Sequence, residues 1–137
     1  MSKYVIDSWA WIEYLEGSKS GSKVKDLILD QANEIFTHAV SAAEIISKAK
    51  RRGKDVEAIW QAINSNSKLV SFGADESKEV GLVHAEIKSK NKNFGLADSF
   101  VLTLAKKLNA KVITGDPDFK NIMGVMTCFI SSGYSLV

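Results

Sequence analysis

The sequence predicts an α/β fold of three α/β/α layers, with a central parallel sheet of about four to five short strands covered by helices on both faces. Two observations lead to this prediction. Short runs of β type alternate with helical segments from one end of the 137-residue chain to the other. Several of these runs hold apolar residues in succession, which is typical of strands buried on both faces.

Apolar runs bounded by turn signals predict the strands. The segment KVIT is the clearest buried strand, and KYVID opens the chain as a shorter one. The predicted strands are residues 3–7, 34–37, 68–72, 111–114 and about 126–130. Right-handed crossovers between them are the strong default, whereas the sequence does not specify the order of the strands.

Apolar residues at helical spacing predict the helices. Leu96, Phe100, Leu104 and Leu108, for example, fall on one line of a helix. The predicted helices are residues 8–16, about 22–32, 41–52, 54–65, 75–90 and 96–108, and DPDFKNI begins a short helical turn. Gly17 closes the first helix, and the segments SKSGS and NKNFG are expected to be loops.

Size and composition indicate one globular domain spanning residues 1–137. The apolar fraction of 45% and the charged fraction of 25% are ordinary for such a domain. No apolar run approaches the roughly 18 residues of a membrane span, and the N-terminus lacks the layout of a signal peptide, so a cytoplasmic protein that does not contact a membrane is expected. The single cysteine excludes an internal disulfide and a cysteine-based zinc site.

Four acidic residues stand where strands end and helices begin: Asp7, Glu44, Asp98 and Asp116. Asp7 and Asp116 both follow β-type runs, so a parallel sheet places them at the same edge, where open α/β sheets build their sites. Carboxylates gathered there must take up protons or bind a cation. Oxygen ligands suit a hard divalent ion such as Mg²⁺ or Mn²⁺.

Each of these residues also has a purely structural explanation. Asp7 and Asp116 are placed as helix N-caps, Asp116 with Pro117 behind it. Ser41 and Glu44 match a capping box, and Asp98 falls in a first turn, where the helix dipole favours a carboxylate. Capping and metal binding are compatible, because a carboxylate has two oxygens.

The segments YVIDSWAWIEYLEG, SAAEI, FGLADSFVLTLAKKL and KVITGDPDF together resemble the PIN-domain family of nucleases, most closely toxins of the VapC type. The resemblance covers nearly the full chain in order and spacing. It implies a PIN-like fold and an acidic pocket made by Asp7, Glu44, Asp98 and Asp116, with the three aspartates as direct metal ligands. Ser8 and Thr114 then hold the carboxylates in place, and Asp118 occupies the position of a further acidic residue.

The activity implied by the resemblance is cleavage of RNA with Mg²⁺ or Mn²⁺ as cofactor. A carboxylate-held ion offsets the charge of the phosphodiester and activates water. Basic residues of the cluster at 48–54, namely Lys48, Arg51 and Arg52, are then expected to hold the RNA backbone, and the lysines at 88, 90 and 92 form a second basic cluster. A small antitoxin protein and a homodimer are the partners that the resemblance implies.

Three other functions stay open at this point. The chain is alternatively a PIN-type nuclease in RNA processing or on structured DNA, or a non-catalytic module whose acidic cluster serves only as an interaction surface. A domain that binds a small phosphorylated ligand is the third, but neither GxGxxG nor GxxxxGK[ST] occurs in the sequence. His38, which follows the second strand, is more simply a structural residue than a catalytic one.

Overall fold

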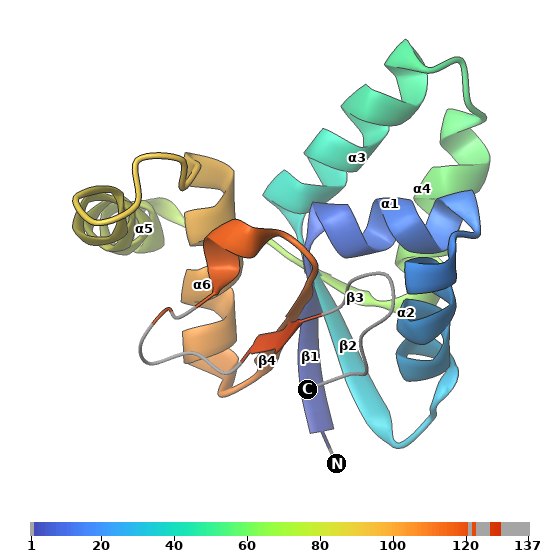
Figure 1. Ribbon diagram of the computed structural model, residues 1–137, viewed down its shortest axis with the longest axis horizontal. Coiled ribbons are helices and arrows are strands. Elements are labelled where there is room, and N and C mark those ends of the chain that lie inside the picture. Colours follow the sequence, from blue (N-terminus) through green and yellow to red (C-terminus); the bar gives the residue numbers. More distant parts are fainter. Residues whose placement is uncertain (1, 121, 123–126, 130–137) are drawn as a thin grey trace.

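Five strands form one parallel sheet in the computed structural model, which describes residues 2–120, 122 and 127–129 (Figure 1). The strands are β1 (Ser2–Ile6), β2 (Asn33–His38), β3 (Lys68–Val70), β4 (Lys111–Thr114) and β5 (Thr127–Phe129). Their order across the sheet is β3-β2-β1-β4-β5, and all four neighbouring pairs are parallel. The predicted parallel sheet is therefore confirmed, with β1 at its centre.

Helices cover both faces of this sheet, which confirms the three-layer prediction. They are α1 (Ser8–Glu16), α2 (Lys19–Leu29), α3 (Ala39–Arg51), α4 (Val56–Asn66), α5 (Ala74–Lys88) and α6 (Leu96–Leu108), and η1 (Pro117–Phe119) is a short 3-10 helix. Figure 1 shows α1 and α2 on one side of the strands and α5 and α6 on the other. Within the described part of the chain, none of the helices has the length and apolar character needed to cross a membrane.

The alternation of side chains along the strands creates two cores. Ile6 and Ile113 face the core shared with α1 and α2, whereas their neighbours Val5 and Val112 face the core shared with α6. All four are fully buried, and burial of such a side chain contributes about 1.5–3 kcal/mol. A slip of one residue would turn each strand's apolar set to the wrong face, so the packing fixes where β1 and β4 end.

Most predicted boundaries agree with the structure to within two or three residues, including 96–108 and 111–114, which agree at both ends. The third strand ends at Val70 rather than at residue 72. In the last predicted strand, residues 127–129 are confirmed, while 126 and 130 lie outside the described residues.

The prediction of a loop at SKSGS is wrong, because α2 begins within it at Lys19. Ser18 is the N-cap of this helix, and its hydroxyl accepts a hydrogen bond from the backbone N–H of Gly21 at 3.0 Å. Gly21 is buried where α2 crosses α1, and a Cβ atom there would overlap the backbone carbonyl of Glu13. The glycine that suggested a loop is thus required for the close approach of two helices.

We expect the Gly21→Ala substitution to lower the free energy of unfolding by about 1–3 kcal/mol, because backbone atoms of α1 cannot move away from the new methyl group. Gly81→Ala is the matched control. Gly81 also lies inside a helix, but nothing stands within 4 Å of its Cβ position, so alanine there should stabilise by about 0.5–1 kcal/mol. Urea unfolding of both variants measures the two effects, and equal responses would contradict this explanation of Gly21.

Candidate active site

Three neighbouring strands deliver acidic residues to one edge of the sheet. Asp7 directly follows β1, Asp116 follows β4 by two residues, and β2 leads into α3, which carries Glu44. Asp98 comes from the first turn of α6, which packs on β1, β2 and β4. Since β1 lies between β2 and β4, the order of the strands brings these segments together at the carboxyl edge.

Asp7 is the most deeply placed of the four, with only 3% of its surface exposed. It is the N-cap of α1, as the structural alternative predicted, and its Oδ1 accepts a hydrogen bond from the backbone N–H of Ala10 at 2.8 Å. Burial raises the pKa of its carboxyl to about 7, and the charges of Asp98 and Asp116 add to this rise. Hydrogen bonds from Thr114 and Ala10 act in the opposite direction without offsetting it.

Asp98 links the group electrostatically. Burial raises the pKa of its carboxyl to about 6, although its hydrogen bond from the N–H of Gly95 at 3.2 Å favours the charged form. The charges that raise it further belong to Asp116, Glu44 and Asp118. Residues from α3, α6 and the segment after β4 therefore share one electrostatic environment.

Thr114 connects two of the aspartates. Its hydroxyl donates a hydrogen bond to Asp7 and accepts one from the backbone N–H of Asp116 at 3.0 Å. Asp116 is itself an N-cap followed by Pro117, and its Oδ1 accepts a hydrogen bond from the N–H of Asp118 at 2.9 Å. Because Thr114 is fully buried, its hydroxyl fixes the relative positions of these two acidic residues.

Glu44 stands on α3 at the exposed rim of the group. Partial burial raises the pKa of its carboxyl, and a hydrogen bond from the hydroxyl of Ser8 lowers it. The predicted capping box with Ser41 is wrong, because β2 continues to His38 and α3 begins at once, with His38 as its N-cap. Glu44 therefore lies beyond the first turn, where capping does not explain it.

The donor set fits a hard divalent cation better than any softer metal. It consists of carboxylate oxygens, which hard cations prefer. Each of the three aspartates accepts a backbone N–H at one oxygen, and Asp7 also accepts the hydroxyl of Thr114. Among residues 2–120, 122 and 127–129, no three Asp, Glu, His or Cys side chains already form a set of metal ligands. The aspartates thus share one anionic environment, and joint binding of an ion would require their side chains to change position.

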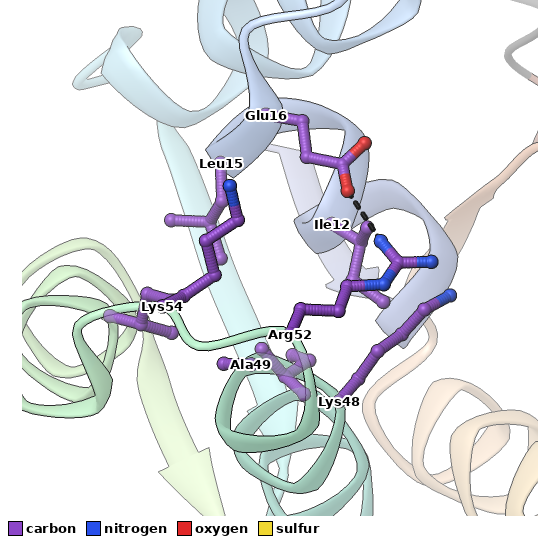
Figure 2. A pocket seen from close by; sticks show the side chains of 9 residues that line it. Ile12, Leu15, Glu16, Lys48, Ala49, Arg52 and Lys54 are labelled. Carbon is purple, nitrogen blue, oxygen red and sulfur yellow. Dashed lines mark hydrogen bonds and ion pairs between the residues drawn. The ribbon is translucent and has the colours of Figure 1, made fainter.

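The predicted RNA-contacting residues divide between two hollows. Lys48 and Arg51 line an open hollow together with Ser8 and Glu44, which we call the α3 hollow. Arg52 turns instead into a neighbouring cavity of about 450 Å³ between α1, α3 and α4, where it forms an ion pair of 2.6 Å with Glu16 (Figure 2). Lys48 also reaches this second cavity, so it stands between the two.

Two further side chains bear on the site. Asn91, from the predicted NKNFG loop, donates from Nδ2 to the backbone oxygen and to Oδ1 of Asp118, both at 3.5 Å. Nothing in the local sequence signals this contact.

His38 is buried against the rings of Phe72 and Phe100, and burial lowers its pKa, so the ring is neutral and structural, as expected.

Comparison with solved structures shows the same fold in proteins of toxin–antitoxin pairs. VapBC2 from Rickettsia felis, solved bound to a DNA fragment from its promoter, gives a TM-score of 0.73 at 19% identity, over 94% of this chain and 99% of that one. VapBC from Salmonella typhimurium, solved bound to DNA, gives a TM-score of 0.70 at 17% identity, over 93% of this chain and 97% of that one. VapC20 from Mycobacterium tuberculosis, a toxin that cleaves the sarcin-ricin loop, gives a TM-score of 0.64 at 12% identity, over 80% of this chain and 86% of that one.

A search of curated protein sequences gives no significant match. The profile of the PIN domain, in contrast, matches residues 4–124. That range begins within β1 at Tyr4 and holds β2 to β4, the helices α1 to α6 and every acidic residue of the candidate site. The chain therefore belongs to the PIN-domain family.

Proposed function

We propose that this protein is a cytoplasmic, metal-dependent endoribonuclease that acts as the toxin of a toxin–antitoxin pair. One observation carries the proposal: four carboxylates from four separate segments act on one another at the carboxyl edge of a PIN-domain sheet. A buried carboxyl with a pKa of about 7 is costly to keep charged unless a cation or a proton accompanies it. Clusters of this kind are typical of catalytic sites.

Asp7, Asp98 and Asp116 are the residues that would hold Mg²⁺ or Mn²⁺, which supplies charge neutralisation at the phosphate and activation of water. Asp7 is held in position by the hydroxyl of Thr114, and Glu44 by that of Ser8. Glu44, at the exposed rim, is placed to orient the attacking water or to accept its proton at a carboxylate oxygen. Asp118 adds negative charge beside Asp98 without being one of the three principal ligands.

The substrate is expected to approach over the α3 hollow. Lys48 and Arg51 line that hollow on the same helix as Glu44, so they can hold backbone phosphates next to the acidic residues. Such contacts supply affinity and position the strand, and they do not select a sequence. Arg52 is less suited to binding RNA phosphates, because its guanidinium already pairs with Glu16.

A small antitoxin is proposed as the partner that keeps the nuclease inactive. The support is the fold shared with VapBC complexes from Rickettsia felis and Salmonella typhimurium and with a toxin–antitoxin complex from Klebsiella pneumoniae. An anionic pocket is also suited to an arginine, whose planar guanidinium pairs with two carboxylate oxygens at once. A homodimer stays a prediction.

The direct test is incubation of the purified chain with a panel of single-stranded and hairpin RNAs under three conditions: EDTA, Mg²⁺ and Mn²⁺. Cleavage products should form only when a divalent ion is present, because the carboxylates alone repel the phosphodiester. Calorimetric titration with Mn²⁺ accompanies the assay and should show saturable binding. Intact RNA under all three conditions, with no saturable binding of Mn²⁺, would favour the acidic interaction module instead.

A further inference from the structure

A further hollow is lined by Asp118 together with residues of α5, α6 and the segments that follow α5 and η1. We call it the α5–α6 hollow. Its volume is about 410 Å³, and it is open to solvent. Three lysines and three aliphatic residues dominate its lining: Lys90, Lys106, Lys120, Val83, Ile87 and Ile122. These residues come from three separate parts of the chain, so no single run of basic sequence accounts for the hollow.

Asp118 joins this hollow to the acidic site. It lines the hollow, and its backbone N–H donates a hydrogen bond to Oδ1 of Asp116 at 2.9 Å. Asn91, which also lines the hollow, holds Asp118 by hydrogen bonds of 3.5 Å. Glu44 lines the α3 hollow beside Ser8, the residue that directly follows Asp7. The acidic residues thus lie between two hollows, each with cationic side chains.

The composition of the α5–α6 hollow matches one flank of a nucleic-acid strand. Val83 and the part of Ile87 that does not pack on the core give the lining an apolar side that a ribose can contact, and ammonium groups bind phosphates as point charges. Glu86 is the one acidic lining residue besides Asp118, so the lysines outnumber the carboxylates. An extended single strand, whose bases are unstacked and accessible, fits this combination of surfaces better than a duplex.

We propose that the α5–α6 hollow is a second subsite for single-stranded RNA, which holds the nucleotides on the far side of the cut phosphate from the α3 hollow. The inference rests on the proposed ribonuclease function and extends it. The strand would cross the acidic residues with phosphates on Lys48 and Arg51 at one flank and on Lys90 and Lys106 at the other.

Lysines close to Lys90 and Lys106 in the sequence provide a matched control. Lys107 follows Lys106 on α6 but pairs with Glu79 at 3.0 Å, and Lys88 precedes Lys90 by two residues at the end of α5. Neither lines the hollow. The double variants Lys90→Gln/Lys106→Gln and Lys88→Gln/Lys107→Gln both lower the formal net charge of +2 by two units, and the second also removes the exposed ion pair with Glu79.

Binding of a fluorescent single-stranded RNA is measured by anisotropy at several salt concentrations in EDTA, so that no RNA is cut. For Lys90→Gln/Lys106→Gln, the slope of log K against log salt should shrink by about 0.7 for each lost phosphate contact. Affinity at low salt should fall roughly tenfold or more. The control variant should stay close to wild type. Glu86→Gln, which removes a negative charge from the lining, should bind RNA more tightly than wild type.

Equal slopes and affinities for the two double variants would overturn the RNA subsite. The result would then favour an acidic protein as the partner that binds in this hollow. The metal-dependent cleavage assay of the wild type is run in parallel and tests the nuclease itself. If the wild type cuts RNA while the two double variants bind alike, the subsite fails and the nuclease stands. If the variants bind differently while the wild type cuts nothing, the subsite for RNA stands and the nuclease fails.

Discussion

Asp7→Asn should lower metal-dependent cleavage of RNA by at least about a hundredfold. The substitution replaces the carboxylate of a proposed metal ligand by a neutral amide at the most buried position of the acidic group. Losing only about 2.7 kcal/mol of stabilisation in the transition state already gives a factor of one hundred. The fold should persist, because an asparagine at this position still accepts the hydrogen bond from the N–H of Ala10 and caps α1. Initial cleavage rates at saturating Mn²⁺, with circular dichroism as the check on folding, measure the effect.

Asp55→Asn is the matched control. Asp55 is also an N-cap, since its Oδ1 accepts a hydrogen bond from the N–H of Ala58 at 3.1 Å, but it is exposed at the start of α4 and outside the acidic group. This variant should cut RNA at the rate of the wild type. If Asp7→Asn cuts RNA as fast as Asp55→Asn does, then Asp7 is a cap and nothing more, and the proposed site is wrong.

The architecture was accessible from the sequence because its signals are local and repeated. Strands buried on both faces, such as KVIT, read as continuous apolar runs, and α6 shows a helical stripe from Leu96 to Leu108. The positions of Asp7 and Asp116 followed from the same reading, since parallel strands end at one edge. Thr114 contacts both aspartates, and the role that the family resemblance implied for it at a metal site stays a prediction.

What the sequence did not reveal depends on contacts between distant segments. Gly21 looks like a loop residue until α1 is known to lie against it. The start of α3 was misplaced by two residues because Ser41 offered a plausible cap, whereas the structure uses His38, a less common cap. Lys90 follows the end of α5 and Lys106 lies on α6, and only the packing of α5 on α6 brings them to one hollow.

Without metal, the protein should become less stable as the pH rises, through the buried carboxyls. The pKa of Asp7 is raised from 3.8 to about 7, so the folded form holds its proton over a range in which the unfolded chain has already lost it. The folded state therefore binds more protons than the unfolded state between these two values, and the free energy of unfolding falls with increasing pH across that window. Asp98, with a pKa raised to about 6, acts in the same direction. Burial lowers the pKa of His38 below the usual value of a histidine. At pH values below that usual value, the unfolded chain binds more protons at this residue than the folded protein, so His38 makes the protein more stable as the pH rises.

Comparison of wild type with Asp7→Asn cancels the contribution of His38 and isolates that of Asp7. In EDTA, the free energy of unfolding of the variant relative to wild type should rise by on the order of 3 kcal/mol between about pH 5 and about pH 8, because the variant has no carboxyl to ionise at this position. Urea unfolding at several pH values measures this difference. Addition of Mn²⁺ at the higher pH should stabilise the wild type and have much less effect on the variant, since an ion that binds only the folded state shifts the equilibrium toward it. A difference that does not change with pH would mean that Asp7 titrates normally, and the electrostatic argument for a cation at this edge of the sheet would fail with it.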